Sequence, residues 1–279
     1  MANTIELFKQ YVPMLDEVYK NAALSSVLDG AAELATQGKN ANELVIPMMQ
    51  MDGLADYSRN GGYVNGDVSL TYETKKCNFD RGRMFNVDSL DNAESAGIAY
   101  GRLASEFIRT KVVPELDAFR FAAYASVEGI GSATGTLSSG ANVVTALRDA
   151  TNKMDEDEVP VEERYLFITP TLGSLIDDLD TTKSRAIMER FSKVTRVPQT
   201  RFYTAIEQIE GGFTKAGNDI NFLIVHKPAV IQFQKHVAPK VITPEQNQSA
   251  DAWKFGYRNV GIAEAYNNKV AGIFVHHKA

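Results

Sequence analysis

A long polar, glycine-rich segment between two strand-like runs constrains the fold of this chain more than any other feature. Residues 52–67 contain four glycines and few large apolar side chains. Fixing the backbone of one residue costs about 1–2 kcal/mol, and this segment has little surface to bury in return. Segments this long without structure of their own are uncommon inside compact domains and are usually functional. We therefore expect the segment to gain order from contacts outside its own hairpin.

The runs on either side of this segment have the pattern of strands. Residues 43–51 are mostly apolar, and Val68, Leu70 and Tyr72 alternate with polar residues. The pattern predicts a long hairpin with a tip at residues 55–65. At that tip, burial of a large apolar side chain returns roughly 1.5–3 kcal/mol, and an arginine can pair bidentately with a carboxylate. The residues predicted to contact a partner are Asp56, Tyr57, Arg59 and Tyr63. The alternative is a free surface loop without a partner.

A strand and a long helix are predicted next. Residues 77–87 form the strand, and Asp88 or Ser89 offers an N-cap acceptor for a helix over residues 91–113. Pro114 is expected to break or restart that helix, and residues 115–126 continue as a second one. Before the hairpin, residues 1–40 have an interrupted helical pattern, with a weak amphipathic segment at residues 24–37. We interpret these first residues as an arm.

A stretch of small residues at 128–140 is the clearest candidate boundary in the chain. Beyond it, helices are predicted at residues 141–154 and 171–179, and strands at residues 165–168, 194–197 and 221–225. This is the pattern of a mixed α/β unit. The last 50 residues return to strands, with a turn at Asn267–Asn268 before a strand over residues 270–276.

Composition excludes several classes of protein. Hydrophobic residues make up 44% of the 279 residues, including 14 Phe and 11 Tyr, so the chain can bury a core. The formal net charge of −6 has the wrong sign for a surface that grips phosphates. The single cysteine, Cys77, excludes intrachain disulfides and multi-cysteine metal sites. The sequence has no apolar run near the roughly 20 residues that span a bilayer, and it begins without a signal pattern, so we expect synthesis in the cytosol.

The sequence does not specify a reaction, a cofactor or a metal site. The glycines of residues 129–140 resemble a nucleotide loop, but their spacing departs from the dinucleotide pattern, and the phosphate-loop Lys and Ser/Thr are missing. The histidines do not form a pair at helical spacing. The carboxylates of residues 155–158 fit a solvated loop after a helix, and Cys77 is interpreted as an inert thiol in a strand. We expect a protein that is not an enzyme. The histidines are His226, His236, His276 and His277.

The order of these elements resembles the major capsid proteins of tailed bacteriophages, with the phage HK ninety-seven type of fold. The local likeness lies in residues 51–63, 72–83, 106–120, 197–203, 220–226 and 251–258, in the right order over nearly the whole chain. These motifs are signatures of folding and assembly and carry no catalytic residue. The specificity of the resemblance lies in their combination.

The resemblance implies an α+β capsid fold with five parts. These would be an N-terminal arm at residues 1–45, an extended loop at 46–76, a peripheral domain with a spine helix at 77–127, an axial domain at 128–227, and returning strands of the peripheral domain at 228–279. Some family members also link subunits by a Lys–Asn isopeptide bond. Lys75, Lys76, Asn267 and Asn268 offer the residue types, but the sequence does not identify a pair.

The implied function is a capsid subunit that assembles through hexamers and pentamers into an icosahedral shell around double-stranded DNA. Its partners would be copies of itself, packaged DNA without sequence-specific contacts, and separate scaffolding, portal or decoration proteins. It would be assembled in the host cytoplasm and would reside in the virion, with no membrane partner. The nearest alternative is an encapsulin, a cargo shell of the same fold. A different class is a cytosolic α/β enzyme that binds a nucleotide at residues 129–140.

Overall fold

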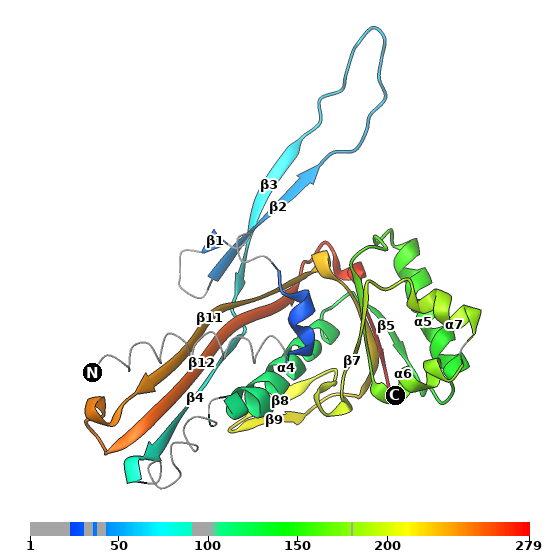
Figure 1. Ribbon diagram of the computed structural model, residues 1–279. Helices are drawn as coiled ribbons and strands as arrows, with labels where there is room; N and C mark the ends of the chain where they lie inside the picture. Colours follow the sequence, from blue (N-terminus) through cyan, green and yellow to red (C-terminus); the bar gives the residue numbers. More distant parts are fainter. Residues whose placement is uncertain (1–22, 31–35, 38–42, 91–102, 104, 180) are drawn as a thin grey trace.

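A computed structural model describes residues 23–30, 36–37, 43–90, 103, 105–179 and 181–279. Two sheets form the body of the molecule, and a long hairpin projects from it (Figure 1). The first sheet is antiparallel with strand order β11-β12-β4. It consists of β4 (Phe79–Asp88), β11 (Val230–Ile242) and β12 (Ala252–Ala265). The strand predicted at residues 77–87 is confirmed by β4.

The second sheet has five strands in the order β5-β13-β10-β6-β7, with antiparallel pairs around β10 and parallel pairs at both edges. Its strands are β5 (Gly131–Thr134), β6 (Arg164–Ile168), β7 (Lys193–Arg196), β10 (Ile220–His226) and β13 (Ile273–His277). The helices that accompany it are α5 (Gly140–Glu156), α6 (Pro170–Asp177) and α7 (Thr182–Met188). The mixed α/β pattern predicted for this part of the chain is confirmed.

The central strand β10 is buried along its whole length, which explains its continuous apolar sequence. Because successive side chains of a strand point to opposite faces, β10 contributes to two separate cores. Phe222 and Ile224 pack in the cluster that contains α5 and α6 residues. Leu223 and Val225 pack in the cluster that contains Phe121 of the long helix. The sheet therefore lies between two helical layers.

The long helix passes through Pro114 without a break. A π-helical turn, η3 (Ile108–Val112), leads directly into α4 (Val113–Ala125), with helical backbone angles at Val112 and Val113. Pro114 lacks the N–H that a helix interior needs, and the π-helical turn is the irregularity that precedes it. The helix is therefore not broken at Pro114, and its α-helical geometry restarts at Val113, as one of the two expected outcomes. Leu90 N–H donates to Asp88 Oδ1 (2.9 Å), as expected for the N-cap. Most of the predicted helix at 91–113, namely residues 91–102 and 104, lies outside the described residues.

A short 3₁₀ helix, η1 (Leu24–Leu28), is held against α4 by buried polar groups. The Asp117 carboxylate is fully buried. It accepts hydrogen bonds from the backbone N–H groups of Leu24 and Ser25, both at 3.1 Å, and from the Ser25 hydroxyl at 2.6 Å. Arg201 Nη1 lies 3.1 Å from Asp117 Oδ2. In the weak amphipathic segment at residues 24–37, η1 is helical and β1 (Thr36–Gln37) is a strand, while residues 31–35 lie outside the described residues.

The projecting hairpin joins β2 (Glu43–Met51) to β3 (Val68–Lys76) in antiparallel register, and β1 pairs with β2 at its base. The predicted hairpin is confirmed. A second, smaller hairpin, β8 (Ile206–Ile209) with β9 (Gly212–Lys215), was not anticipated from the sequence. Further 3₁₀ turns are η4 (Gln199–Arg201), η5 (Lys227–Ala229), η6 (Pro244–Gln246) and η7 (Val270–Gly272).

Three other details differ from the sequence expectations. Residues 270–272 form a turn, and the strand begins only at Ile273. That strand, β13, pairs with β10 and not with β11 or β12, so the last 50 residues do not form one set of strands. Cys77 lies in the two-residue connection between β3 and β4, where it packs partly buried against Ile231 and Ile262. Among the described residues, the structure has no helix long and apolar enough to cross a membrane.

Candidate functional site

The tip of the projecting hairpin has a defined local structure. The Tyr57 and Tyr63 rings meet edge to face with centroids 4.9 Å apart. Between them Ser58 and Gly62 form an isolated bridge, and Gly62 has a φ of 74°, which favours glycine. Where the strands end, Asp52 Oδ2 accepts the N–H of Asp67 at 2.9 Å. The structure therefore brings together the two tyrosines that the sequence predicted as contact residues.

The tip exposes large apolar surface to solvent. Tyr57 is 60% exposed and Tyr63 is 89% exposed, and Leu54 and Val64 are similarly open. Asp56 and Arg59 are exposed too, and neither forms an ion pair with any described residue. Sequence reasoning missed Leu54, which lies just outside the predicted tip. Since a monomer gains nothing from presenting this surface to water, the tip has the composition of a contact surface.

One face of the hairpin continues this exposed apolar surface toward its base. Met49 lies opposite Leu70, and Met51 lies opposite Val68, so these side chains share one face of the two strands. All of them are at least 50% exposed, and so is Tyr72, two residues beyond Leu70. The hairpin therefore carries an apolar strip along its length.

The base of the hairpin is tied to the body by Lys75. Its ammonium lies 3.2 Å from Glu264 Oε2, at the end of β12, and 3.3 Å from Asn267 Oδ1. The sequence could not tell which of the lysines and asparagines come together. The geometry is that of an ion pair and a hydrogen bond within one chain.

A groove of about 990 Å³ lies between β4, the π-helical turn and the β8–β9 hairpin. Its apolar lining includes Phe85 and Phe107, whose ring centroids are 4.8 Å apart, and Ile209, which is 42% exposed. Sequence reasoning missed this groove because its walls come from three separate parts of the chain. The only sequence signal was that apolar residues occupy alternate positions in β4, which indicates the face of the strand that forms one wall of the groove.

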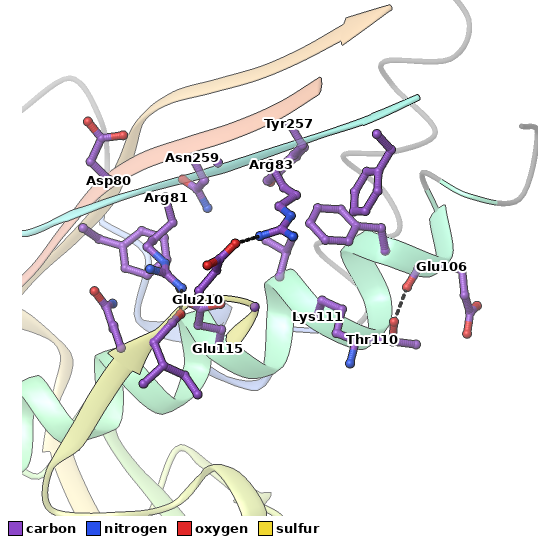
Figure 2. Close-up of a pocket in the computed structure, with 18 of the residues that line it drawn as sticks. Asp80, Arg81, Arg83, Glu106, Thr110, Lys111, Glu115, Glu210, Tyr257 and Asn259 are labelled. Carbon is purple, nitrogen blue, oxygen red and sulfur yellow. Dashed lines mark hydrogen bonds and ion pairs between the residues drawn. The ribbon is translucent and has the colours of Figure 1, made fainter. Parts of the chain in front are cut away.

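Charged side chains line the groove (Figure 2). Arg81 Nε donates to Glu115 Oε1 at 2.7 Å and reaches the carbonyl oxygen of Ile209 at 2.6 Å. Burial raises the pKa of Glu115, although the nearby Arg81 guanidinium opposes this shift. Arg83 spans the opening to Glu210, 3.3 Å away. These contacts join β4 to α4 and to the β8–β9 hairpin.

Asn259 on β12 lines the groove with both polar atoms of its side chain unsatisfied. The residue is 1% exposed, and neither Nδ2 nor Oδ1 has a hydrogen-bond partner. An unpaired buried amide costs roughly 1–3 kcal/mol. Such an unsatisfied amide is an exception among buried polar groups.

The glycines of residues 129–140 serve packing. A Cβ at Gly131 would collide with the Phe274 ring, and a Cβ at Gly140 would collide with the carbonyl oxygen of Leu175. Ser139 caps α5 by accepting the Asn142 N–H at 3.3 Å. Because the helix start is packed against α6 in this way, a phosphate cannot approach Gly140. The geometry therefore weighs against the nucleotide loop.

Several titratable groups outside the groove are buried or have structural partners. Burial lowers the pKa of His226 and of His276, and His276 Nδ1 lies 2.9 Å from Asn221 Nδ2. Asp155 forms ion pairs with Arg164 and Arg190, so it is more than a solvated loop residue. Among the described residues, His, Cys, Asp and Glu do not form a group of three that could hold a metal ion.

Solved structures resemble this chain, although neither a protein-family model nor a curated protein sequence matches it. The capsid of the cyanophage P-SCSP1u matches with a TM-score of 0.56 and 12% identity, over 88% of this chain and 84% of that chain. A structure from Gordonia phage Cozz matches with a TM-score of 0.62 and 10% identity, over 91% and 86% of the two chains. The chain has the phage capsid fold. A virus-like particle from Pyrococcus furiosus also matches, with a TM-score of 0.54 and 15% identity, over 94% and 98%.

The phage capsid fold confirms the fold class expected from the sequence, which is α+β with an extended hairpin and a long helix. At these identities the likeness concerns the fold alone. It covers most of each chain. Within this fold the exposed tip and the groove are two surfaces at which described residues present unsatisfied apolar or polar groups.

Proposed function

We propose that this protein is the major capsid protein of a tailed bacteriophage and assembles through hexamers and pentamers into an icosahedral shell around double-stranded DNA. The observation that carries the proposal is the projecting hairpin on a phage capsid fold, with exposed apolar side chains at its tip. Burying each of these side chains against a neighbour contributes roughly 1.5–3 kcal/mol. Repeated over a closed shell, this contact stabilises the assembly and orders the tip.

The parts of the chain receive roles in this proposal. Residues 1–45 act as an arm, 46–76 as the extended loop, and 77–127 as a peripheral domain with the spine helix. Residues 128–227 form the axial domain around the capsomer centres, and residues 228–279 return to the peripheral domain. The pairing of β13 with β10 supports placing residues 273–277 with the axial sheet. Asp56, Tyr57, Arg59 and Tyr63 are the proposed contact residues of the loop.

The partners follow from charge and surface chemistry. Copies of the chain itself are the main partner, and separate scaffolding, portal or decoration proteins are further ones. A net charge of −6 suits an inner wall that encloses DNA without holding it in place. The protein acts without a cofactor and without catalysis. Assembly takes place in the host cytoplasm, and the mature location is the virion capsid.

An encapsulin-type cargo shell is the second candidate. The virus-like particle from Pyrococcus furiosus favours it, because the match spans 98% of that chain. Both candidates require the same shell, so they differ in what the shell contains.

Electron microscopy of the purified protein tests the proposal, with and without coexpressed accessory proteins of its own genome. We expect closed icosahedral particles. Particles purified after nuclease treatment should protect DNA if the protein is a phage capsid subunit, and should contain a defined protein cargo if it is an encapsulin. A chain that stays monomeric at high concentration under both conditions would contradict the proposed function.

A further inference from the structure

We propose that Asn65, between β2 and β3, is a site of spontaneous deamidation in the unassembled subunit, where its side-chain amide is replaced by a carboxylate. The chain contains two Asn–Gly pairs, Asn60–Gly61 and Asn65–Gly66, and all four residues are exposed. Asparagine is thermolabile in proteins, and a glycine that follows it has no side chain to shield its backbone nitrogen. The structure distinguishes the two pairs.

The reaction needs only water as a co-reactant. The backbone nitrogen of Gly66 attacks Cγ of Asn65, and the new N–C bond closes a succinimide ring. The side-chain nitrogen leaves as ammonia and takes the proton of the attacking N–H. Water then opens the ring at either carbonyl carbon, which gives aspartate or isoaspartate. Each conversion adds one negative charge to a chain whose formal net charge is −6.

The backbone around Asn65 can reach the geometry of attack. Residues 63–66 lie outside the strands and the turn of this segment, and neither Asn65 nor Gly66 forms a hydrogen bond with any described residue. The chain is fixed only at the next residue, where the N–H of Asp67 donates to Asp52 Oδ2 at 2.9 Å. Backbone without hydrogen bonds rearranges at little cost in free energy, so the Gly66 nitrogen can approach the side chain.

The other pair, Asn60–Gly61, is held in a turn. The Gly61 N–H donates to the Ser58 hydroxyl oxygen at 3.1 Å, and the backbones of Ser58 and Gly62 exchange hydrogen bonds at 2.8 and 3.3 Å. The nitrogen that would attack Asn60 must first leave its hydrogen bond. We therefore expect conversion at Asn65 to be faster by about fivefold or more, the factor that one hydrogen bond contributes.

The conversion would alter the surface that the proposed function uses, and this consequence rests on that function. The new carboxylate lies two residues from the exposed Tyr63 ring, and burying a charge in a contact is costly. Isoaspartate also lengthens the backbone by one atom. A subunit that stays unassembled should therefore lose its ability to assemble, while a subunit whose tip is buried in a shell keeps its asparagine.

Mass spectrometry of the aged subunit tests the site. The purified full chain is incubated at neutral pH and digested with chymotrypsin, which cleaves after Tyr57 and Tyr63 and so separates the two pairs. Digestion in heavy-oxygen water marks the conversions that occur during the digest. In the folded chain, Asn65 should convert about fivefold faster than Asn60 or more, whereas the two rates should be similar in urea. Equal rates in the folded chain, or no conversion at Asn65, would refute the proposal.

The substitution Gly66→Ala tests the role of the glycine. The added Cβ lies 3.5 Å from Asp52 Cβ, which is an ordinary contact, so the loop can keep its conformation. Conversion at Asn65 should slow several-fold, and conversion at Asn60 should not change. An unchanged rate at Asn65 would show that the Gly66 nitrogen is not the attacking group.

The substitution Ser58→Ala tests the protection of the other pair. It removes the acceptor of the Gly61 N–H, so Asn60 should convert faster while Asn65 is unaffected. If Asn60 stays slow, the turn does not explain the difference between the two sites, and the structural basis of the assignment is wrong.

The consequence for assembly has its own test. Asn65→Asp should assemble less readily than Asn152→Asp, which adds the same charge at an exposed position of α5. Chains recovered from particles should retain Asn65 longer than free chains of the same age. Equal assembly of the two variants would refute the consequence and leave the site in place. If the unmodified chain does not assemble at all, the proposed function has failed, and the rates in the free chain still decide the site.

Discussion

The carboxylate of Asp117, in the middle of α4, accepts hydrogen bonds from both the backbone N–H and the hydroxyl of Ser25, at 3.1 and 2.6 Å. Ser25 is itself fully buried, so this contact fixes the chain that precedes the hairpin onto the long helix. Arg120 adds a hydrogen bond to the Ser25 hydroxyl at 3.0 Å. A buried charge with this many partners stabilises one arrangement only, since every donor loses its partner if the segment shifts.

The substitution Asp117→Ala should destabilise the subunit by about 3–5 kcal/mol, because it leaves Arg201 and the N–H groups of η1 without their acceptor. Urea unfolding of the isolated chain measures this loss. The matched control is Asp149→Ala on α5, whose side chain is 68% exposed and should change stability by less than about 0.5 kcal/mol. A loss below about 1 kcal/mol for Asp117→Ala would show that the buried network contributes little.

Gly140 is expected to tolerate no side chain. In Gly140→Ala the new Cβ collides with the backbone oxygen of Leu175 and with the Leu179 side chain, so α5 and α6 must separate. Overpacking of this kind costs about 1–3 kcal/mol or more. Gly53→Ala is the control, because nothing lies within 4 Å of the added Cβ. Thermal unfolding of both variants checks the difference, and equal melting temperatures would contradict it.

Acid should destabilise the five-stranded sheet through His276. Burial holds the pKa of His276 below its ordinary value of 6.5, and protonation of Nδ1 would place an N–H against the donating amide of Asn221. The unfolded chain therefore binds more protons below pH 6.5, and stability falls as the pH drops from that value to the lower pKa of the folded state.

The measurement compares unfolding free energies at about pH 7.5 and about pH 5.5, values on either side of the ordinary histidine pKa. In His276→Gln, which keeps an acceptor oxygen near Asn221, the loss on acidification should be smaller than in the unmodified chain. An unchanged pH dependence would mean that other groups, such as His226, account for the effect.

Replacing residues 55–65 by a short Gly-Ser turn should leave cooperative melting nearly intact and abolish shell formation. The reason is that the tip buries little within its own chain, while its exposed side chains form the proposed contact. The double variant Tyr57→Ser with Tyr63→Ser keeps the length of the loop and should impair assembly in the same direction. Light scattering and electron microscopy report assembly, and particles of normal size and stability from the shortened chain would refute the role of the tip.

Shells should dissociate into single chains of 30.7 kDa on denaturing gels. The Lys75 ammonium is held by Glu264 within its own chain, and a protonated amine paired in this way is not a nucleophile toward Asn267. Reductant should make no difference, because the only cysteine, Cys77, packs against the body. A ladder of multimers that survives boiling and reductant would show a covalent link between subunits.

Local patterns in the sequence predicted the hairpin, β4 and the buried strand β10, because each has a period or an apolar run of its own. The π-helical turn and the passage through Pro114 depend on packing and were not predictable from residue type. The β8–β9 hairpin is short and mostly polar, so it lacks a hydrophobic pattern.

The sequence predicted the hairpin tip but not the groove. The tip is polar and glycine-rich and buries little surface of its own, so its need for a partner and four of its contact residues could be predicted from composition. The groove required knowledge of which strands pair, since Asn259 and Phe107 meet only through tertiary structure. The position of β13 beside β10 could not be predicted for the same reason. The pairing partners of an apolar strand are set by the whole sheet and not by the strand itself.

The position of β13 also determines the order in which the subunit can be completed during synthesis. The chain leaves the five-stranded sheet after β10, forms β11 and β12, and only then supplies the strand between β10 and β5. Until residues 273–277 emerge from the ribosome, β10 and β5 each lack a neighbour and the five-stranded sheet remains open. Because pairings between segments this distant in sequence form slowly, this sheet closes only after β11 and β12 have been synthesised.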